Sequence, residues 1–174
     1  MFHAFDSQPA NLPLQRAQWM AVLARTPLPL LESALGEATA ATAGAPQWLR
    51  RPETGLVMVQ GRAGGTGERF NLGEVTVTRC ALRLSGAQQP DAAVGVAYVL
   101  GRSHRHAELA AVADALLQDP AQQAALDTRL LQPAQSHIAM ERAQRHARAQ
   151  SSKVEFFTVA REAGGRNEDE DEAE

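Results

Sequence analysis

Cysteine, lysine and long apolar runs are scarce or missing in this chain of 174 residues. Cys80 is the only cysteine, so an internal disulfide bond is excluded and the usage fits a reducing compartment. No stretch approaches the roughly 18 apolar residues that a membrane-spanning helix needs. The first dozen residues contain neither the basic segment nor the apolar segment of a secretory signal. These absences predict a cytoplasmic protein that does not associate with a membrane.

The charges are unevenly distributed along the chain. The formal net charge is −3, yet residues 168–174 contain six acidic residues and no basic one, which leaves +3 on the rest. A charge this small argues against a general nucleic-acid-binding protein. Nearly all the positive charge is arginine, with Lys153 the only lysine. Arginine suits bidentate binding of phosphate or carboxylate, although a biased base composition is the simpler explanation of the overall preference.

The overall composition predicts a globular protein. Hydrophobic residues (44%) and charged residues (21%) occur at ordinary levels, which excludes a wholly disordered or fibrous chain. We expect a flexible amino-terminal arm over residues 1–12, a single α+β domain over 13–162 and a disordered acidic tail over 163–174. The expected architecture is an antiparallel meander sheet of about four to five strands, flanked by amino- and carboxy-terminal helices.

Two periodicities divide the expected domain. Helical spacing predicts helices over residues 13–25, 28–38 and 134–150, and two more that begin after the N-caps Ser103 and Asp119. Alternation with a period of two predicts strands near residues 56–61, 68–72, 74–84, 93–100 and 153–160.

One strand shows a change of face. Val75 and Val77 lie on one face of the segment 74–84, whereas Cys80 and Leu82 lie on the other. This switch indicates either a bulge near Arg79 or a strand that is covered on both sides.

A glycine-rich segment, Gly61–Phe70, is the first candidate site. Glycines allow backbone N–H groups to converge on a phosphate. However, Glu68 stands where a P-loop has lysine, and Phe70 replaces the third glycine of a dinucleotide fingerprint. The alternative is a tight hairpin turn that needs positive φ angles.

Arginines surround this segment. Arg62, Arg69, Arg79 and Arg83 fall on the predicted meander, with Glu53, Glu68 and Glu74 nearby. The arginines could clamp a polyphosphate or the carboxylates of a partner in bidentate fashion. The alternative is a set of surface ion pairs, each of which contributes little.

The remaining reactive residues do not form a complete catalytic set. His104 and His106 diverge by about 200° in a helix, which argues against a shared metal ion. His104 with Glu108, and His137 with Glu141, lack a third ligand in sequence, so capping or surface hydrogen bonds are the simpler roles. Cys80 lies in apolar strand sequence and is expected in the core. No nucleophile elbow or catalytic triad order is present.

Three stretches together resemble the PhnG family of the carbon–phosphorus lyase system. They read ETGLVMVQGRAGGTGERFNLGEVTVTRCALRL over residues 53–84, GRSHRHAELAAVADALL over 101–117, and SSKVEFFTVARE over 151–162. The amino-terminal QWM at residues 18–20 is also similar to the family. Residues 1–12 and the acidic tail carry no such resemblance.

The resemblance implies a subunit of a multi-protein core complex that degrades alkyl phosphonates. Such a complex joins methylphosphonate to the ribose carbon of ATP, displaces adenine, and yields alpha-D-ribose 1-methylphosphonate 5-triphosphate. The implied partners are PhnI, PhnH and PhnJ, with PhnL associated, and a homodimer is an alternative for the isolated chain. No cofactor, nucleic acid or membrane is expected for this chain alone, because ATP is a substrate of the complex. The isolated chain is expected to be an inactive part of a transferase.

The sequence and the resemblance together leave two roles open. The subunit either contacts the triphosphate or is a structural scaffold that does not touch the substrate. The candidate substrate or partner contacts are Arg62, Gly64, Gly65, Thr66, Gly67, Glu68, Arg69, Arg79, His106, Phe156 and Phe157. No catalytic residue and no metal ligand is expected. Residues 138–159 are expected to lie partly against another subunit, with Phe156 or Phe157 as the anchor or else as ordinary core.

Overall fold

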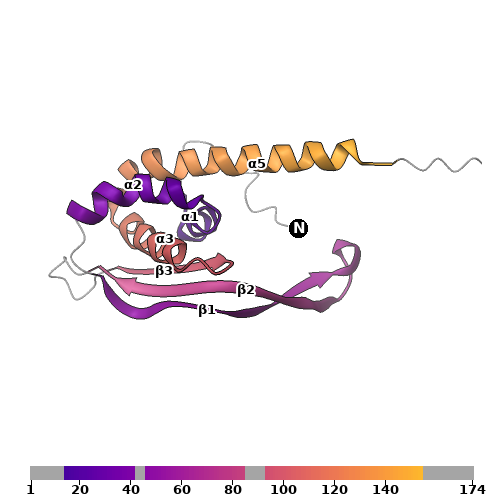
Figure 1. Cartoon of the computed structure of the whole chain (residues 1–174), viewed down its shortest axis with the longest axis horizontal. Helices are drawn as coiled ribbons and strands as arrows, with labels where there is room; N and C mark the ends of the chain where they lie inside the picture. Colours follow the sequence, from indigo (N-terminus) through magenta and orange to yellow (C-terminus); the bar gives the residue numbers. More distant parts are fainter. Residues whose placement is uncertain (1–13, 42–45, 85–92, 155–174) are drawn as a thin grey trace, which may run out of the picture.

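A computed structural model describes residues 14–41, 46–84 and 93–154 of the chain. Its elements follow one another as helices, then strands, then helices (Figure 1). They are α1 (Arg16–Leu23), α2 (Leu28–Ala41), β1 (Gln47–Arg62), the 3₁₀ turn η1 (Ala63–Gly65), β2 (Arg69–Arg83), β3 (Val94–Leu100), α3 (His104–Leu117), α4 (Pro120–Leu126), the π-helical turn η2 (Asp127–Leu131) and α5 (Gln132–Ser151).

The three strands form one antiparallel sheet in the order β1-β2-β3. Helix α3 packs on one face of this sheet, and α1, α2 and α5 lie beyond α3 on the same side (Figure 1). Because strand residues alternate between faces, the buried Thr78, Cys80 and Leu82 face α3. The opposite face of the sheet carries no helix in the described part of the chain.

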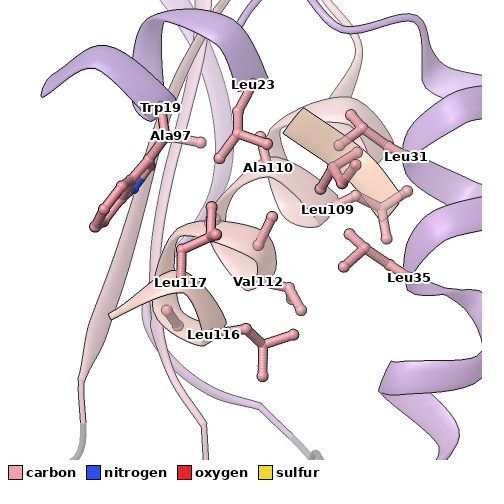
Figure 2. Close-up of a cluster of buried hydrophobic side chains, with 14 of the residues drawn as sticks. Trp19, Leu23, Leu31, Leu35, Ala97, Leu109, Ala110, Val112, Leu116 and Leu117 are labelled. Atoms are coloured by element: carbon pink, nitrogen blue, oxygen red, sulfur yellow. The ribbon is translucent and has the colours of Figure 1, made fainter. Parts of the chain in front are cut away.

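The core lies between the sheet, α3 and the first two helices. Trp19 and Leu23 from α1 and Leu31 and Leu35 from α2 surround the apolar residues of α3 (Figure 2). Gly95 of β3 allows the closest approach, because a Cβ there would overlap the carbonyl oxygen of Ala111. The absence of a side chain at Gly95 therefore lets α3 pack directly on the strand.

A buried carboxylate joins three elements of this core. Asp114 of α3 is fully buried and accepts hydrogen bonds from Arg16 (2.8 Å), from the Trp19 indole (2.8 Å) and from the backbone N–H of Val96 (2.9 Å). The hydrogen bond to Asp114, with the attraction of its charge, holds the pKa of the Arg16 guanidinium above its ordinary value. Arg16 and Gln118 also donate to the carbonyl of Val94. The network thus covers part of the free edge of β3, where unpaired backbone groups would otherwise remain.

The predicted helices and their N-caps are confirmed. The Ser103 side chain accepts from the backbone N–H of His106, and Asp119 accepts from that of Ala121, with Pro120 at the first position of α4. The expected polar helix is α5, which is longer than predicted. Ile138 packs against the core, whereas every residue from 139 to 154 is exposed.

The expectation of four to five strands is not confirmed, because the described residues contain three. The predicted pieces 68–72 and 74–84 are one strand, β2, with a register shift where Val59 pairs with Gly73 and Gln60 with Asn71. The extra residue, Leu72, is accommodated as a bulge and does not end the strand. Lys153 and Val154 are described but belong to no strand, and residues 155–160 lie outside the described residues.

The predicted bulge is not in β2 at Arg79, and in the described part of the chain no helix or strand covers the second face of β2. β2 pairs with β3 without interruption from Val77 to Arg83. The register shifts lie instead in β1, at Trp48/Arg50 and Arg50/Glu53. The change of apolar face has another cause: Val75 and Val77 lie on the helix-free face of the sheet.

Several expectations lie outside the described residues. These are the flexible arm over 1–12, the acidic tail over 163–174, and the two phenylalanines, Phe156 and Phe157. Among the residues that are described, no helix is long and apolar enough to cross a membrane.

Candidate functional site

The first feature of the site is a hairpin that extends beyond the domain. β3 ends at Leu100, which pairs with Val77, and the backbone N–H of Gly101 donates to the carbonyl of Thr76. From Arg69 to Val75, β2 therefore has only β1 as a neighbour. We call residues 55–76 the distal hairpin. In Figure 1 it projects on the same side as the second half of α5, beyond α1 and α3. It is therefore a two-stranded ribbon whose edges are both free within the described part of the chain.

The glycine-rich segment forms the turn at the tip of this ribbon. Gly64 and Gly65 have φ angles of 59° and 81°, which side chains rarely adopt. The backbone N–H of Gly67 donates to the carbonyl of Ala63 at 3.0 Å and closes the turn. The hairpin-turn interpretation is thus confirmed, and the helix of a P-loop does not follow. Thr66 and Glu68 are exposed beside it.

Arg62 and Arg69 lie directly opposite each other at the base of the turn. Both are exposed, and neither forms an ion pair with any described residue. Residues that pair across strands share one face, so the two guanidinium groups project on the same side of the ribbon. This arrangement presents two planar cations to one anion, such as a phosphate chain or a pair of carboxylates.

Arg79 belongs to a different group, at the base of the distal hairpin. Its Nε lies 2.7 Å from the Glu53 carboxylate, to which Arg50 also donates. The hydrogen bonds from Arg50 and Arg79 lower the pKa of Glu53 below its ordinary value. Ten residues of strand separate Arg79 from Arg69, which corresponds to roughly 30 Å. The predicted arginine cluster is therefore divided along β2. The tip pair lacks an acidic partner among the described residues, Arg79 has Glu53, and Arg83 has no ion pair to a described residue and a buried Nε without a hydrogen-bond partner.

A shallow cavity of about 260 Å³ lies beside the Glu53–Arg79 pair on the helix-free face. Gly55, Val57 and Val77 line it together with this pair. Two large side chains of β3 are exposed on the same face, Tyr98 at 54% and Leu100 at 71%. The helix-free face of the sheet thus continues into the distal hairpin as a mainly apolar surface.

The distal hairpin itself exposes large apolar side chains on both faces. Leu56 (63%) and Met58 (47%) share the face of Arg62, while Val57 (47%) lies on the other face. Leu72 (62%) lies against Gly61, on the face of Val57. This surface was missed in the sequence analysis. The available signal was the unbroken apolar run at residues 56–59, which puts large apolar side chains on both faces of β1.

His104 and His106 form hydrogen bonds that join elements of the fold. The Nε2 atom of His106 lies 2.9 Å from the carbonyl oxygen of Leu23 and joins α3 to α1. His104 lies 3.1 Å from the Thr54 hydroxyl, which in turn contacts Thr78. The two rings therefore contact different elements, α1 and β1. In the part of the chain that the structure describes, no three potential ligands gather as a metal site.

Cys80 is in the core, as predicted. Its thiol is buried and donates to the carbonyl of Ala107 at 3.0 Å. Burial, with a smaller contribution from the Glu108 charge, raises the pKa of the thiol to about 12. A thiol held in this form is a poor nucleophile. The described residues therefore bring no nucleophile, base and orienting group together.

Comparisons with known proteins agree on one family. The model of the family described as "Phosphonate metabolism protein PhnG" matches residues 14–162. A curated protein of Rhizobium meliloti (strain 1021), named as alpha-D-ribose 1-methylphosphonate 5-triphosphate synthase subunit PhnG, is 38% identical over 147 residues. The match covers 84% of this chain and 89% of that protein.

Proposed function

Since the chain belongs to the PhnG family, we propose that it is a subunit of the synthase that forms alpha-D-ribose 1-methylphosphonate 5-triphosphate in organic phosphonate catabolism. The likeness extends over most of both chains, so it covers the whole domain and not a shared fragment. The reaction assigned to the complex joins methylphosphonate to the ribose of ATP. A phosphonate oxygen forms a bond to the anomeric carbon as the bond from that carbon to adenine breaks.

The contribution of this chain is to bind and position. The observation that carries this role is the pair Arg62 and Arg69, aligned without an acidic partner at the tip of a projecting hairpin. Both the substrate and the product carry a triphosphate, whose oxygens suit two adjacent guanidinium groups. Backbone N–H groups of the turn Gly64–Gly67 add donors beside them. The catalytic groups come from other subunits, in line with the incomplete set in the described residues.

A scaffold that does not touch the substrate is the alternative role. It is favoured by the apolar faces of the distal hairpin, which suit protein contacts better than a nucleotide. The two roles differ in what happens at the tip. A scaffold tolerates the loss of both tip arginines as long as the complex assembles.

The partners proposed for this subunit are PhnI, PhnH and PhnJ, with PhnL associated. The complex is proposed to act as a transferase in the cytoplasm, with no cofactor on this chain. A pair of identical chains is the alternative association for the isolated protein.

A reconstitution experiment tests the proposed function. The synthase subunits are purified separately and combined with ATP and methylphosphonate, with and without this chain, and adenine release is followed by chromatography. We expect adenine only when this chain is present together with its partners. Release by the chain alone, or by the partners without it, overturns the proposal.

A further inference from the structure

The distal hairpin lacks cover from its own domain. An isolated two-stranded hairpin is marginally stable in water, and three strands or a packed helix are normally needed. Here the ribbon of residues 55–76 receives neither, since β3 stops at Leu100 and α3 packs on the other end of the sheet. Apolar groups nevertheless occupy both faces, with Leu56 on one and Val57 on the other. Exposed apolar surface of this kind marks a contact with another molecule.

The distribution of charge on the distal hairpin indicates the chemistry of the surface that would cover it. Residues 55–61 contain no charged side chain, and Arg62, Glu68 and Arg69 lie together at the tip. Glu74, which pairs with Met58, is the one charged side chain along the length of the ribbon. The free edges also lack the lysines and prolines that discourage strand pairing. The complementary surface is therefore mainly apolar along its length, with a polar group opposite Glu74, and anionic at its inner end.

The kind of molecule that covers the distal hairpin follows from the apolar side chains on both of its faces. A second copy of this chain, packed by two-fold symmetry, would bury one face or one edge and leave the other face exposed. A groove encloses both. We propose that the distal hairpin inserts into an apolar groove of a different subunit of the synthase, which buries both of its faces and brings Arg62 and Arg69 to an anionic site. This inference rests on the proposed function, because it takes its partner from the same complex.

Two adjacent residues on opposite faces provide the test. Leu56→Asp and Val57→Asp are introduced separately, and the tagged chain is used to capture the purified partner subunits. The matched control is Leu49→Asp in the part of β1 outside the distal hairpin, where the leucine is 50% exposed, close to the 47% of Val57. We expect each hairpin variant to reduce capture at least about tenfold, since a charge buried in an apolar groove is unpaired. The control should bind as the unchanged chain does.

The outcomes separate the alternatives. Full capture by both hairpin variants overturns the inference, and loss with only one of them overturns the claim that both faces are buried. If a variant unfolds, hydrogen exchange of the unchanged chain replaces it: amides of residues 55–76 should exchange more slowly once the partners are added, and equal rates overturn the inference. Protection in the isolated chain at high concentration, without partners, identifies a second copy as the occupant and also overturns it. Capture measures binding and does not require turnover. A synthase assay that fails therefore does not decide the outcome of this test.

Discussion

Arg62 and Arg69 are the last residue pair of β1 and β2, and they face each other across the hairpin without an intervening acid. Like charges in directly opposite positions destabilise a sheet, typically by less than about 1 kcal/mol. At the tip of an otherwise uncovered ribbon, this repulsion has no structural benefit within the described chain. It is offset when an anion binds between the two guanidinium groups.

We expect Arg69→Ala to reduce adenine release by the reconstituted synthase at least about tenfold, the effect of losing one strong charge-assisted contact. Stability of the isolated chain should stay the same or rise slightly, because the repulsion is relieved. The control is Arg148→Ala near the end of α5, where the side chain is exposed and solvated. Equal activity of the two variants in fully assembled complexes would show that the tip does not contact substrate and would favour the scaffold role.

The sequence predicted the elements that depend on neighbouring residues. The caps at Ser103 and Asp119 and the helices of the domain follow from local spacing, and the structure confirms them. The glycine turn was predicted for the same reason, since positive φ angles are a local property.

Features that depend on distant residues were not predictable in this way. The run Leu56–Val59 is apolar on both faces, a pattern that is typical of a strand buried in its own domain. Only the end of β3 at Leu100 shows that the domain provides no cover there. The separation of Arg79 from Arg69 likewise depends on their places along one long strand. The hydrogen bond between Arg16 and Asp114 joins residues 98 positions apart, and no local sequence pattern predicts it.

Asp114 is the clearest stability determinant of the core. We expect Asp114→Asn to lower the free energy of unfolding by about 2 kcal/mol, because the buried side chain loses its ion pair with the half-exposed Arg16 and is left with unsatisfied polar groups. The Asn side chain does not substitute, since the partners Arg16, Trp19 and the Val96 backbone are all donors and the new NH₂ group would face one of them. Urea denaturation measures the change. Glu141→Gln on the exposed face of α5 is the control and should change stability by less than about 0.5 kcal/mol. A small effect at Asp114 would mean that the network contributes little.

Two glycines should respond to alanine with opposite signs. Gly95→Ala places a methyl group on the carbonyl oxygen of Ala111, and we expect a loss of about 2–3 kcal/mol as α3 moves away from β3. Gly36→Ala adds a methyl group where nothing lies within 4 Å, inside α2. That variant should gain about 0.5–1 kcal/mol through reduced backbone entropy of the unfolded chain. Thermal and urea unfolding of both variants check this, and a destabilised Gly36 variant together with an unaffected Gly95 variant would contradict the packing described.

The last prediction concerns the only thiol. Burial raises the pKa of Cys80 from 9.0 to about 12, so the folded chain holds the proton more tightly than the unfolded chain does. Two consequences follow from this sign. Native stability from this group is complete below pH 9 and decreases as the pH rises toward 12, because the unfolded state then loses its proton first. At pH 8 the native thiol should react only slowly with iodoacetamide, since the reagent needs an exposed thiolate.

Mass spectrometry of the labelled chain measures this reactivity at one site, because no other cysteine is present. We expect labelling in the native state to be at least about 100-fold slower than in 8 M urea, with the remaining reaction limited by transient opening of the core. Cys80→Ala provides the blank. If the native chain is labelled as fast as the unfolded one, Cys80 is accessible and its hydrogen bond to the Ala107 carbonyl does not hold it in the core. A native rate that follows the concentration of urea in step with global unfolding would place β2 and α3 in the most stable part of the domain, since both must separate before the thiol is exposed.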